Sequence, residues 1–190
     1  MRLAHSEFIL GGQKSGKSRR AEQLAVAWLN ADPRRQAVLI ATAHAGDAEM
    51  QQRISRHQRD RLERVPRLHT VEESTDLAGA LRAHSRADTM LLVDCMTLWL
   101  THALMPLRGA PRPVETAIQD IFSALATLPG PVVLVGNEIG LGVVPMGPEV
   151  RAFVDALGLL NQGLAQACER VTLMVAGLPL VLKGAACADR

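Results

Sequence analysis

The feature that most constrains the fold is an eight-residue pattern near the start of the chain. The P-loop pattern G-x-x-x-x-G-K-[ST] is matched by Gly11-Gly12-Gln13-Lys14-Ser15-Gly16-Lys17-Ser18. An apolar run at residues 8–10 precedes the pattern, and a helix-compatible run at residues 19–29 follows it. Backbone N–H groups of such a loop surround a polyphosphate, and the positive end of the following helix attracts its charge. The pattern therefore predicts a nucleoside triphosphate site.

Two polar side chains of this pattern have expected roles in that site. Lys17 would reach the β- and γ-phosphates, and the hydroxyl of Ser18 would bind Mg²⁺. The alternative is a glycine-rich turn that carries a lysine by chance. The strand-like and helix-like flanks favour the nucleotide site, because a P-loop joins a strand to a helix.

Short apolar runs and helix-compatible segments alternate along the rest of the chain. Strands are expected at residues 37–41, 68–71, 90–93, 131–136, 171–176 and 180–182. Helices are expected at residues 48–63, 97–105, 114–128 and 149–169, and another is expected to follow a cap at Ser74 or Thr75 and to run to His84. This alternation predicts an α/β fold. We expect a single P-loop nucleotide-binding domain over residues 1–190, with a mainly parallel sheet and helices on both faces.

Polar clusters follow several of the expected strands. They are the P-loop, residues 42–46, Asp94-Cys95 and Asn137-Glu138. In a parallel sheet these clusters meet at one edge, beyond the carboxyl ends of the strands, where ligands bind. Asp94 is typical of a Walker B acid that holds Mg²⁺, although an aspartate that caps the next helix is the alternative. Glu138 is either a second metal-binding or base carboxylate, or a residue that stabilises a turn.

The expected helix at residues 48–63 carries an unusual line of side chains. One helical face is shared by Met50, Ile54, His57 and Arg61. Other arginines lie close by in the sequence: Arg53, Arg56, Arg59 and Arg64. Guanidinium groups bind phosphate oxygens bidentately, and positive charge around an imidazole favours its neutral, nucleophilic form. A solvated basic helix is the plainer interpretation of the same pattern.

Several longer motifs resemble one family in order and spacing. The Arg-Ile-x-x-His helix at residues 53–57 and the loop Asn137-Glu138-Ile139-Gly140-Leu141-Gly142-Val143-Val144-Pro145 are specific to it. Other matching segments are Ala41-Thr42-Ala43, Thr70-Val71-Glu72, residues 94–100 and Ala176-Gly177-Leu178-Pro179. The chain resembles the bifunctional adenosylcobinamide kinase/adenosylcobinamide-phosphate guanylyltransferases of cobalamin biosynthesis over essentially its whole length.

The resemblance implies two reactions on a corrinoid substrate. In the first, ATP or GTP phosphorylates the hydroxyl of the aminopropanol arm of adenosylcobinamide. In the second, GTP reacts with an enzyme histidine, and the guanylyl-histidine passes GMP to the corrinoid phosphate to give adenosylcobinamide-GDP. The family's histidine falls on His57. An imidazole suits this step because it is a good nucleophile near neutral pH.

The resemblance also implies a nucleotide site, a metal and an assembly. Besides the P-loop, the nucleotide-binding residues would be Thr42, Ala43, His44, Gln58, Arg59, Asp60, Arg61, Glu72 and Asp94. Mg²⁺ would be held by Ser18 and Asp94, and the RecA-like subunits would form a homotrimer. Two departures stand out. Lys14 occupies a position where the family usually has arginine, and a longer segment after His57 leaves open whether Arg61 or Arg64 is the family's arginine.

Composition argues against several other classes of protein. A net charge of +2 without a basic or aromatic stripe disfavours a nucleic-acid partner. No apolar run approaches the roughly 20 residues that span a bilayer, and the first residues lack the layout of a signal peptide. Cys95, Cys168 and Cys187 form no C-x-x-C pair, which disfavours a zinc site or disulfide framework and predicts a cytoplasmic location.

Two rival functions stay open on the sequence. A single-function P-loop kinase of small molecules would leave His57 as a surface histidine. A RecA-like switch or motor would bind DNA or a partner protein, and the near-neutral charge disfavours it.

Overall fold

The computed structural model describes residues 3–43, 48–106 and 113–185, and in the helix 48–64 it describes residues 48–51, 53, 54, 56 and 57 by their backbone alone. Strands and helices alternate along these residues. They are β1 (Ser6–Gly11), α1 (Lys17–Ala31), β2 (Gln36–Ala41), α2 (Ala48–Arg64), β3 (Leu68–Glu72), α3 (Leu77–His84), β4 (Thr89–Asp94), α4 (Met96–Leu104), α5 (Val114–Leu125), β5 (Val132–Asn137), α6 (Pro148–Ala167), β6 (Arg170–Val175) and β7 (Leu178–Lys183).

The strands of the described chain form one seven-stranded sheet in the order β3-β2-β4-β5-β1-β6-β7. All neighbouring pairs are parallel except β6 and β7, which are antiparallel. Parallel neighbours need long crossover connections, and here helices supply most of them. The predicted fold class, a mainly parallel α/β sheet covered by helices, is confirmed.

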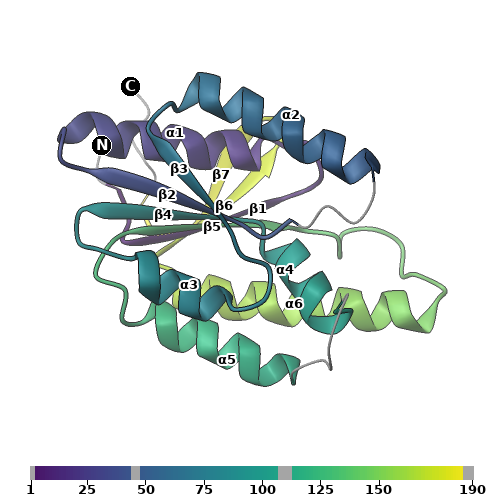
Figure 1. Ribbon diagram of the computed structural model, residues 1–190. Helices are drawn as coiled ribbons and strands as arrows, with labels where there is room; N and C mark the ends of the chain where they lie inside the picture. The colour runs from purple at the N-terminus through teal and green to yellow at the C-terminus, as the bar shows by residue number, and fades with distance from the viewer. Residues whose placement is uncertain (1–2, 44–47, 107–112, 186–190) are drawn as a thin grey trace.

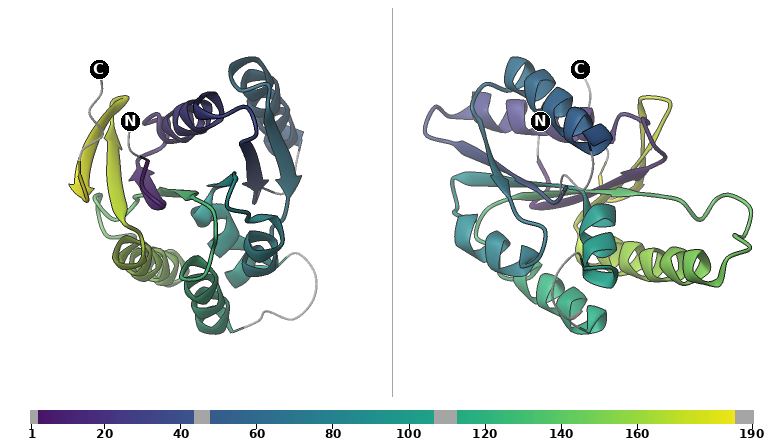
Figure 2. Two further views of the ribbon diagram at one scale, coloured as in Figure 1. Left: turned by 90° about the vertical axis from the view of Figure 1, so that its left-hand side faces the viewer. Right: turned by 45° about the vertical axis from the view of Figure 1, so that its right-hand side comes forward.

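Helices cover both faces of the sheet because the buried strands are apolar on both sides. In β1, Phe8 points into the core shared with α3, α4, α5 and α6, whereas Ile9 points into the core shared with α1. Ile40 and Leu39 divide in the same way in β2. Figure 1 shows α1 and α2 on one side of the sheet and the other helices on the opposite side, and the left view of Figure 2 shows these layers end on.

Two predicted helix boundaries were wrong for identifiable reasons. Helix α3 begins at Leu77 with Asp76 as its N-cap, because the Glu73 carboxylate binds the N–H groups of both Thr75 and Asp76 and holds the preceding turn. Helix α5 ends at Leu125, three residues before the expected end at 128. Pro129 disfavours helical geometry at the residue before it, so the chain turns early.

The last two strands form a tighter hairpin than the sequence pattern predicted. Only Ala176 and Gly177 connect β6 to β7, and both have positive φ angles, 51° and 83°. Such a turn matches the twist of a two-residue hairpin. Pro179 therefore lies inside β7, paired with Met174, which is tolerated because β7 is an edge strand.

Candidate nucleotide site

The P-loop joins the carboxyl end of β1 to the first turn of α1, as predicted. Gly11 is buried with a φ of 153°, and a Cβ atom there would lie 2.5 Å from the carbonyl oxygen of Met174 in β6. Gly16 is the N-cap of α1 with a φ of 99°, a conformation that favours glycine. Both glycines are thus required by the backbone path. This path presents the N-terminus of a 15-residue helix at the edge of the sheet.

Lys17 is held inside this loop. The residue is only 7% exposed, and its Nζ donates a hydrogen bond to the carbonyl oxygen of Gly12 at 2.6 Å. Burial lowers the pKa of Lys17 from its ordinary value, while the charges of Cys95 and Asp94 oppose that shift. A cation at this position lies where the phosphates of a P-loop ligand bind.

Asp94 ends β4 at the same edge of the sheet. It pairs with Val135 of β5, and Val135 pairs with Ile9 of β1, so Asp94 lies level with Ile9, two residues before the end of the P-loop strand. The N-cap of α4 is Cys95, with no side-chain cap hydrogen bond. The alternative in which Asp94 caps α4 is therefore wrong.

Thr42 fixes the backbone beside Asp94. Its hydroxyl accepts from the N–H of Cys95 at 2.8 Å and donates to the Cys95 carbonyl at 2.7 Å. Its own N–H donates to the Asp94 carbonyl at 3.1 Å. Thr42 is fully buried, so this hydroxyl joins the end of β2 to the end of β4.

The segment after β5 also reaches the P-loop. The N–H of Glu138 donates to the carbonyl of Gly11 at 3.1 Å, which confirms that these two clusters meet. The Glu138 carboxylate accepts from the N–H of Gly140 at 2.6 Å. Of the two interpretations of Glu138, the structure therefore supports the one in which it stabilises a turn.

Helix α2 is attached to α1 by an ion-pair cluster centred on Glu22. The Glu22 carboxylate lies 2.7 Å from Arg64 and 3.7 Å from Arg61, with side-chain exposures of 6%, 41% and 10% for Glu22, Arg64 and Arg61. Both arginines that the sequence offered for phosphate binding are thus partnered by one carboxylate. Gln58 reaches Glu72 at the end of β3, at 3.4 Å.

Several predicted site residues are exposed around this edge. Gln13 and Lys14 are exposed in the P-loop, Arg59 and Asp60 are exposed on α2, and Ala43 and Ser18 are half-buried. Neither Arg59 nor Asp60 has a hydrogen bond or ion pair with the P-loop among the described residues. His44 and the side chain of His57 lie outside the described residues.

Sequence reasoning missed two supports of the site. Glu22 was one of them, although a carboxylate among Ala21, Leu24 and Ala25 on the buried face of α1 was a signal that it has a partner. The other is the β6–β7 turn, where the N–H of Gly177 donates to the carbonyl of Ser15 at 3.0 Å. No local pattern in the sequence predicts that contact.

The donor atoms at this edge suit a magnesium nucleotide. The Ser18 hydroxyl and the Asp94 carboxylate are hard oxygen donors, which Mg²⁺ accepts together with water and phosphate oxygens. Within the described residues, no three His, Cys, Asp or Glu side chains form a group that could hold a metal alone.

The same residues include no helix with the length and hydropathy to cross a membrane.

Together these features define a P-loop nucleotide-binding protein with a RecA-like sheet. They are the glycine-rich turn, the N-terminus of the helix after it, the buried lysine and the aspartate at the end of a strand. A KaiC-like protein from the archaeon Pyrococcus horikoshii has a similar fold. Its structure matches 90% of this chain and 71% of its own with a TM-score of 0.50 at 12% identity.

Sequence comparisons define the family. The model of the cobinamide kinase / cobinamide phosphate guanyltransferase family matches residues 7–182. The bifunctional adenosylcobalamin biosynthesis protein CobP of Pseudomonas aeruginosa is 47% identical over 94% of this chain and 97% of its own length. The corresponding CobU protein of Escherichia coli is 33% identical over 93% of this chain and 98% of its own. The chain belongs to this family and is a bifunctional cobinamide kinase and cobinamide-phosphate guanylyltransferase of cobalamin biosynthesis.

Proposed function

We propose that both reactions use the nucleotide site at the P-loop edge. In the kinase reaction, the hydroxyl oxygen of the aminopropanol arm of adenosylcobinamide attacks the γ-phosphorus of ATP or GTP. The bond to the bridging oxygen breaks, the nucleoside diphosphate leaves, and the hydroxyl proton is released. The main support for this proposal is Lys17, which is buried inside the P-loop and interacts electrostatically with Asp94. Its cation would stabilise the charge that develops on the phosphates.

We propose His57 as the nucleophile of the second reaction. One ring nitrogen attacks the α-phosphorus of GTP, pyrophosphate leaves, and GMP stays bound through a P–N bond. A phosphate oxygen of the phosphorylated corrinoid then attacks the same phosphorus, and the imidazole is released. Family membership supports this role. So does the position of His57 on α2, one helical turn before Arg61, whose side chain packs α2 against α1 next to the P-loop.

Mg²⁺ would be held by Ser18 and Asp94, and when bound it would neutralise phosphate charge. The remaining nucleotide contacts divide into two groups. We assign direct contacts to the P-loop residues and, as the resemblance implies, to Ala43, His44, Gln58, Arg59, Asp60 and Glu72. We assign Thr42 to positioning, because its hydroxyl is occupied by the backbone of Cys95. We assign Arg61 to positioning as well, because its Nε lies 3.7 Å from the Glu22 carboxylate and so links α2 to α1.

We further propose that the chain acts as a homotrimer in the cytoplasm. The apolar side chains of Leu178, Leu180 and Leu182 are exposed on the edge strand β7, where an unpaired strand favours association. Cys95 and Cys168 are buried free thiols, which suits a reducing compartment. Light scattering coupled to size exclusion would measure the mass of the assembly, and a monomer at working concentrations would contradict the trimer.

Covalent labelling tests the proposed nucleophile. Protein incubated with GTP labelled at the α-phosphate should carry label that is stable to alkali and labile to acid, as a phosphoramidate is. Label from γ-labelled GTP should instead appear on the corrinoid product. His57→Ala should lose the covalent label and the second reaction while it retains kinase activity, because transfer of the γ-phosphoryl group needs no covalent intermediate.

A matched control is His5→Ala, which replaces an exposed histidine whose ring lies in hydrogen-bond contact with the carbonyl of Leu128, away from the P-loop edge. It should label like the wild type. Full labelling of the His57→Ala protein would refute the assignment of the nucleophile. Absence of label from the wild type, with kinase activity present, would support a single-function kinase mechanism for this chain.

A further inference from the structure

A second polar hollow lies at the edge of the sheet opposite the P-loop. It has a volume of about 410 Å³ and opens at the amino ends of β2, β3 and β4. The P-loop lies at the carboxyl end of β1, which runs parallel to the strands between them. The two sites are therefore separated by the length of the sheet. The polar residues that line the hollow are Arg35, Gln36, Arg67, His69, His84, Arg86 and Thr89.

Within the part of the chain that the structure describes, the lining of this hollow includes three arginines and no carboxylate. Two carboxylates lie beside it: Asp88 accepts from the hydroxyl of Thr89 at 3.2 Å, and Asp32 interacts with the charge of Arg35. Among the described residues, no carboxylate lies within ion-pair distance of Arg35, Arg67 or Arg86. The nearby Asp32 is engaged by Arg34 at 2.9 Å, and the hydrogen bonds from Arg34 lower the pKa of Asp32. The whole chain carries a net charge of only +2, so this concentration of guanidinium groups is local.

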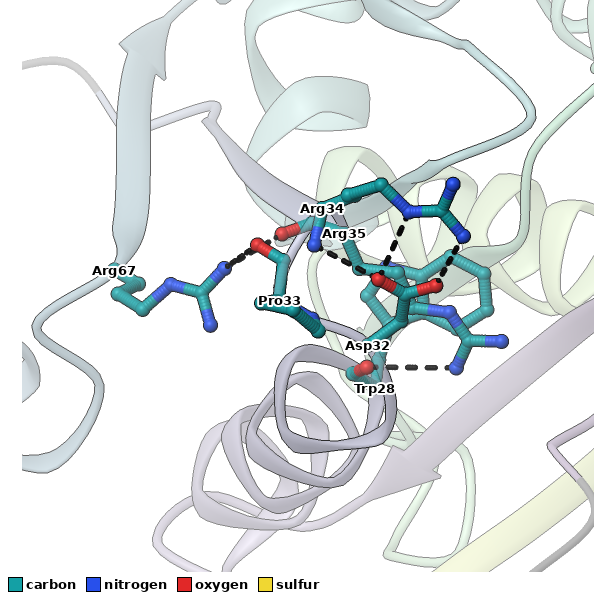
Figure 3. A network of polar contacts seen from close by, with 6 residues as sticks. All are labelled: Trp28, Asp32, Pro33, Arg34, Arg35 and Arg67. Atoms are coloured by element: carbon teal, nitrogen blue, oxygen red, sulfur yellow. Dashed lines mark hydrogen bonds and ion pairs between the residues drawn. The ribbon is translucent and has the colours of Figure 1, made fainter.

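Backbone and ring contacts hold the guanidinium groups in place (Figure 3). Arg67 donates to the carbonyl of Leu29 at 3.2 Å. It also donates to the carbonyls of Pro33 and Arg35 at 3.0 and 2.9 Å, both drawn in Figure 3. Arg35 lies over the ring of Trp28, with 3.8 Å from its central carbon to the ring centroid. A guanidinium group has five N–H donors, so each arginine keeps donors beyond these contacts. Cations held in this way lose little conformational entropy when they bind an anion.

We propose that this hollow binds a small polyphosphate anion, either inorganic pyrophosphate or the phosphate chain of a nucleotide, at a site distinct from the P-loop. Guanidinium forks match phosphate oxygens, and the volume suits a small ligand. Arg35 and Arg86 would bind the ligand from the segments before β2 and β4, and Arg67 would bind it from the segment before β3. The site does not depend on the proposed roles of His57 or the P-loop.

Trp28 provides a readout, because it contacts Arg35 directly and its indole N–H binds the carbonyl of Gln36. Pyrophosphate, ATP and GTP should each be titrated into the Lys17→Ala protein, in which the P-loop is weakened, while Trp28 fluorescence is followed. The other tryptophan, Trp99, is fully buried on the opposite face of the sheet. We expect a saturable change that weakens as salt is added. Equal Kd values for pyrophosphate, ATP and GTP would indicate a site for the polyphosphate alone. Tighter binding of ATP or GTP than of pyrophosphate would indicate a nucleotide site.

Arg86→Ala and Arg35→Gln, each in the Lys17→Ala background, should raise the Kd about tenfold or more, as expected for loss of a charged hydrogen bond. Arg82→Ala is the matched control, because its side chain is exposed on α3, donates to the carbonyl of Asp120 and does not line the hollow. It should leave the Kd within about twofold. Isothermal titration calorimetry would repeat the measurement for Arg35→Gln, since that change alters the surroundings of Trp28. Absence of saturable binding, or an equal rise for Arg82→Ala and Arg86→Ala, would overturn the proposal.

Discussion

The Glu22 cluster gives a stability prediction that can be worked from its geometry. Glu22→Gln keeps the size of the side chain but removes the charge that balances Arg61 and Arg64. Breaking a buried ion pair by removing one partner costs about 3–5 kcal/mol. That range is an upper bound here, because Arg64 is 41% exposed and Arg61 lies 3.7 Å from the carboxylate. Exposed pairs contribute at most about 1 kcal/mol. We therefore expect a loss of about 2–3 kcal/mol.

Chemical denaturation of the wild type and of Glu22→Gln would measure this loss. For a domain of this size each kcal/mol lowers Tm by about 2–4 °C, so thermal unfolding should shift by about 4–12 °C. Gln23→Ala is the matched control, since Gln23 is the exposed neighbour of Glu22 on α1. It should change the free energy of unfolding by less than about 0.5 kcal/mol.

The same variant tests whether the cluster positions α2. If it does, Glu22→Gln should slow formation of the guanylyl-enzyme more than it slows the kinase reaction, because only the former uses a residue of α2, His57, as its nucleophile. A loss of stability below about 0.5 kcal/mol, equal to that of Gln23→Ala, would refute the view that this cluster anchors α2 on α1.

Three further changes have defined outcomes. Lys17→Ala should reduce both activities by at least about 100-fold, because both need charge stabilisation on the phosphates, and assays with α- and γ-labelled GTP would check each reaction. Burial raises the pKa of Cys95 to about 11 and that of Cys168 to about 12, so in a Cys187→Ser background the folded protein at pH 8 should resist thiol reagents that modify it rapidly once denatured. Glu73→Gln tests pH dependence. Partial burial opposes ionisation of Glu73, but hydrogen bonds from the turn after it outweigh that effect and lower its pKa. Its stabilisation, about 0.5–1 kcal/mol, should be present above the ordinary carboxyl pKa and should disappear as pH falls through the lowered folded value, as denaturation of both proteins across this range would show.

The features that the sequence predicted well are those with a local physical cause. The P-loop follows from backbone geometry that glycine permits, and the strands follow from apolar runs of strand length. The convergence of Asp94 and Glu138 on the P-loop follows from the rule that parallel strands end at one edge. Each of these features can be predicted from one short segment or from the order of the segments along the chain. The start of α3 was predicted too early, at a cap by Ser74 or Thr75. The Glu73 carboxylate instead binds the N–H groups of Thr75 and Asp76 and keeps these residues in a turn before the helix.

The features that the sequence did not predict depend on contacts between distant segments. Nothing near Thr42 indicates that its hydroxyl is used by the backbone of Cys95. The arginines of α2 suggested phosphate binding, yet Arg61 and Arg64 are partnered by a carboxylate on another helix. A charged residue on a helix face has the same sequence signature in both cases. Only the tertiary partner distinguishes a substrate contact from a structural ion pair.

The hydrogen bond between Ser15 and Gly177 links the loop after the first strand to the turn between the last two strands of the described chain. Because a polypeptide emerges from the ribosome N-terminus first, the P-loop is synthesised long before the turn that supports it. The contact from Gly177 can therefore form only after β6 and the turn that follows it have been made. A nascent chain arrested before β6 should consequently bind the triphosphate less tightly than one that includes this turn.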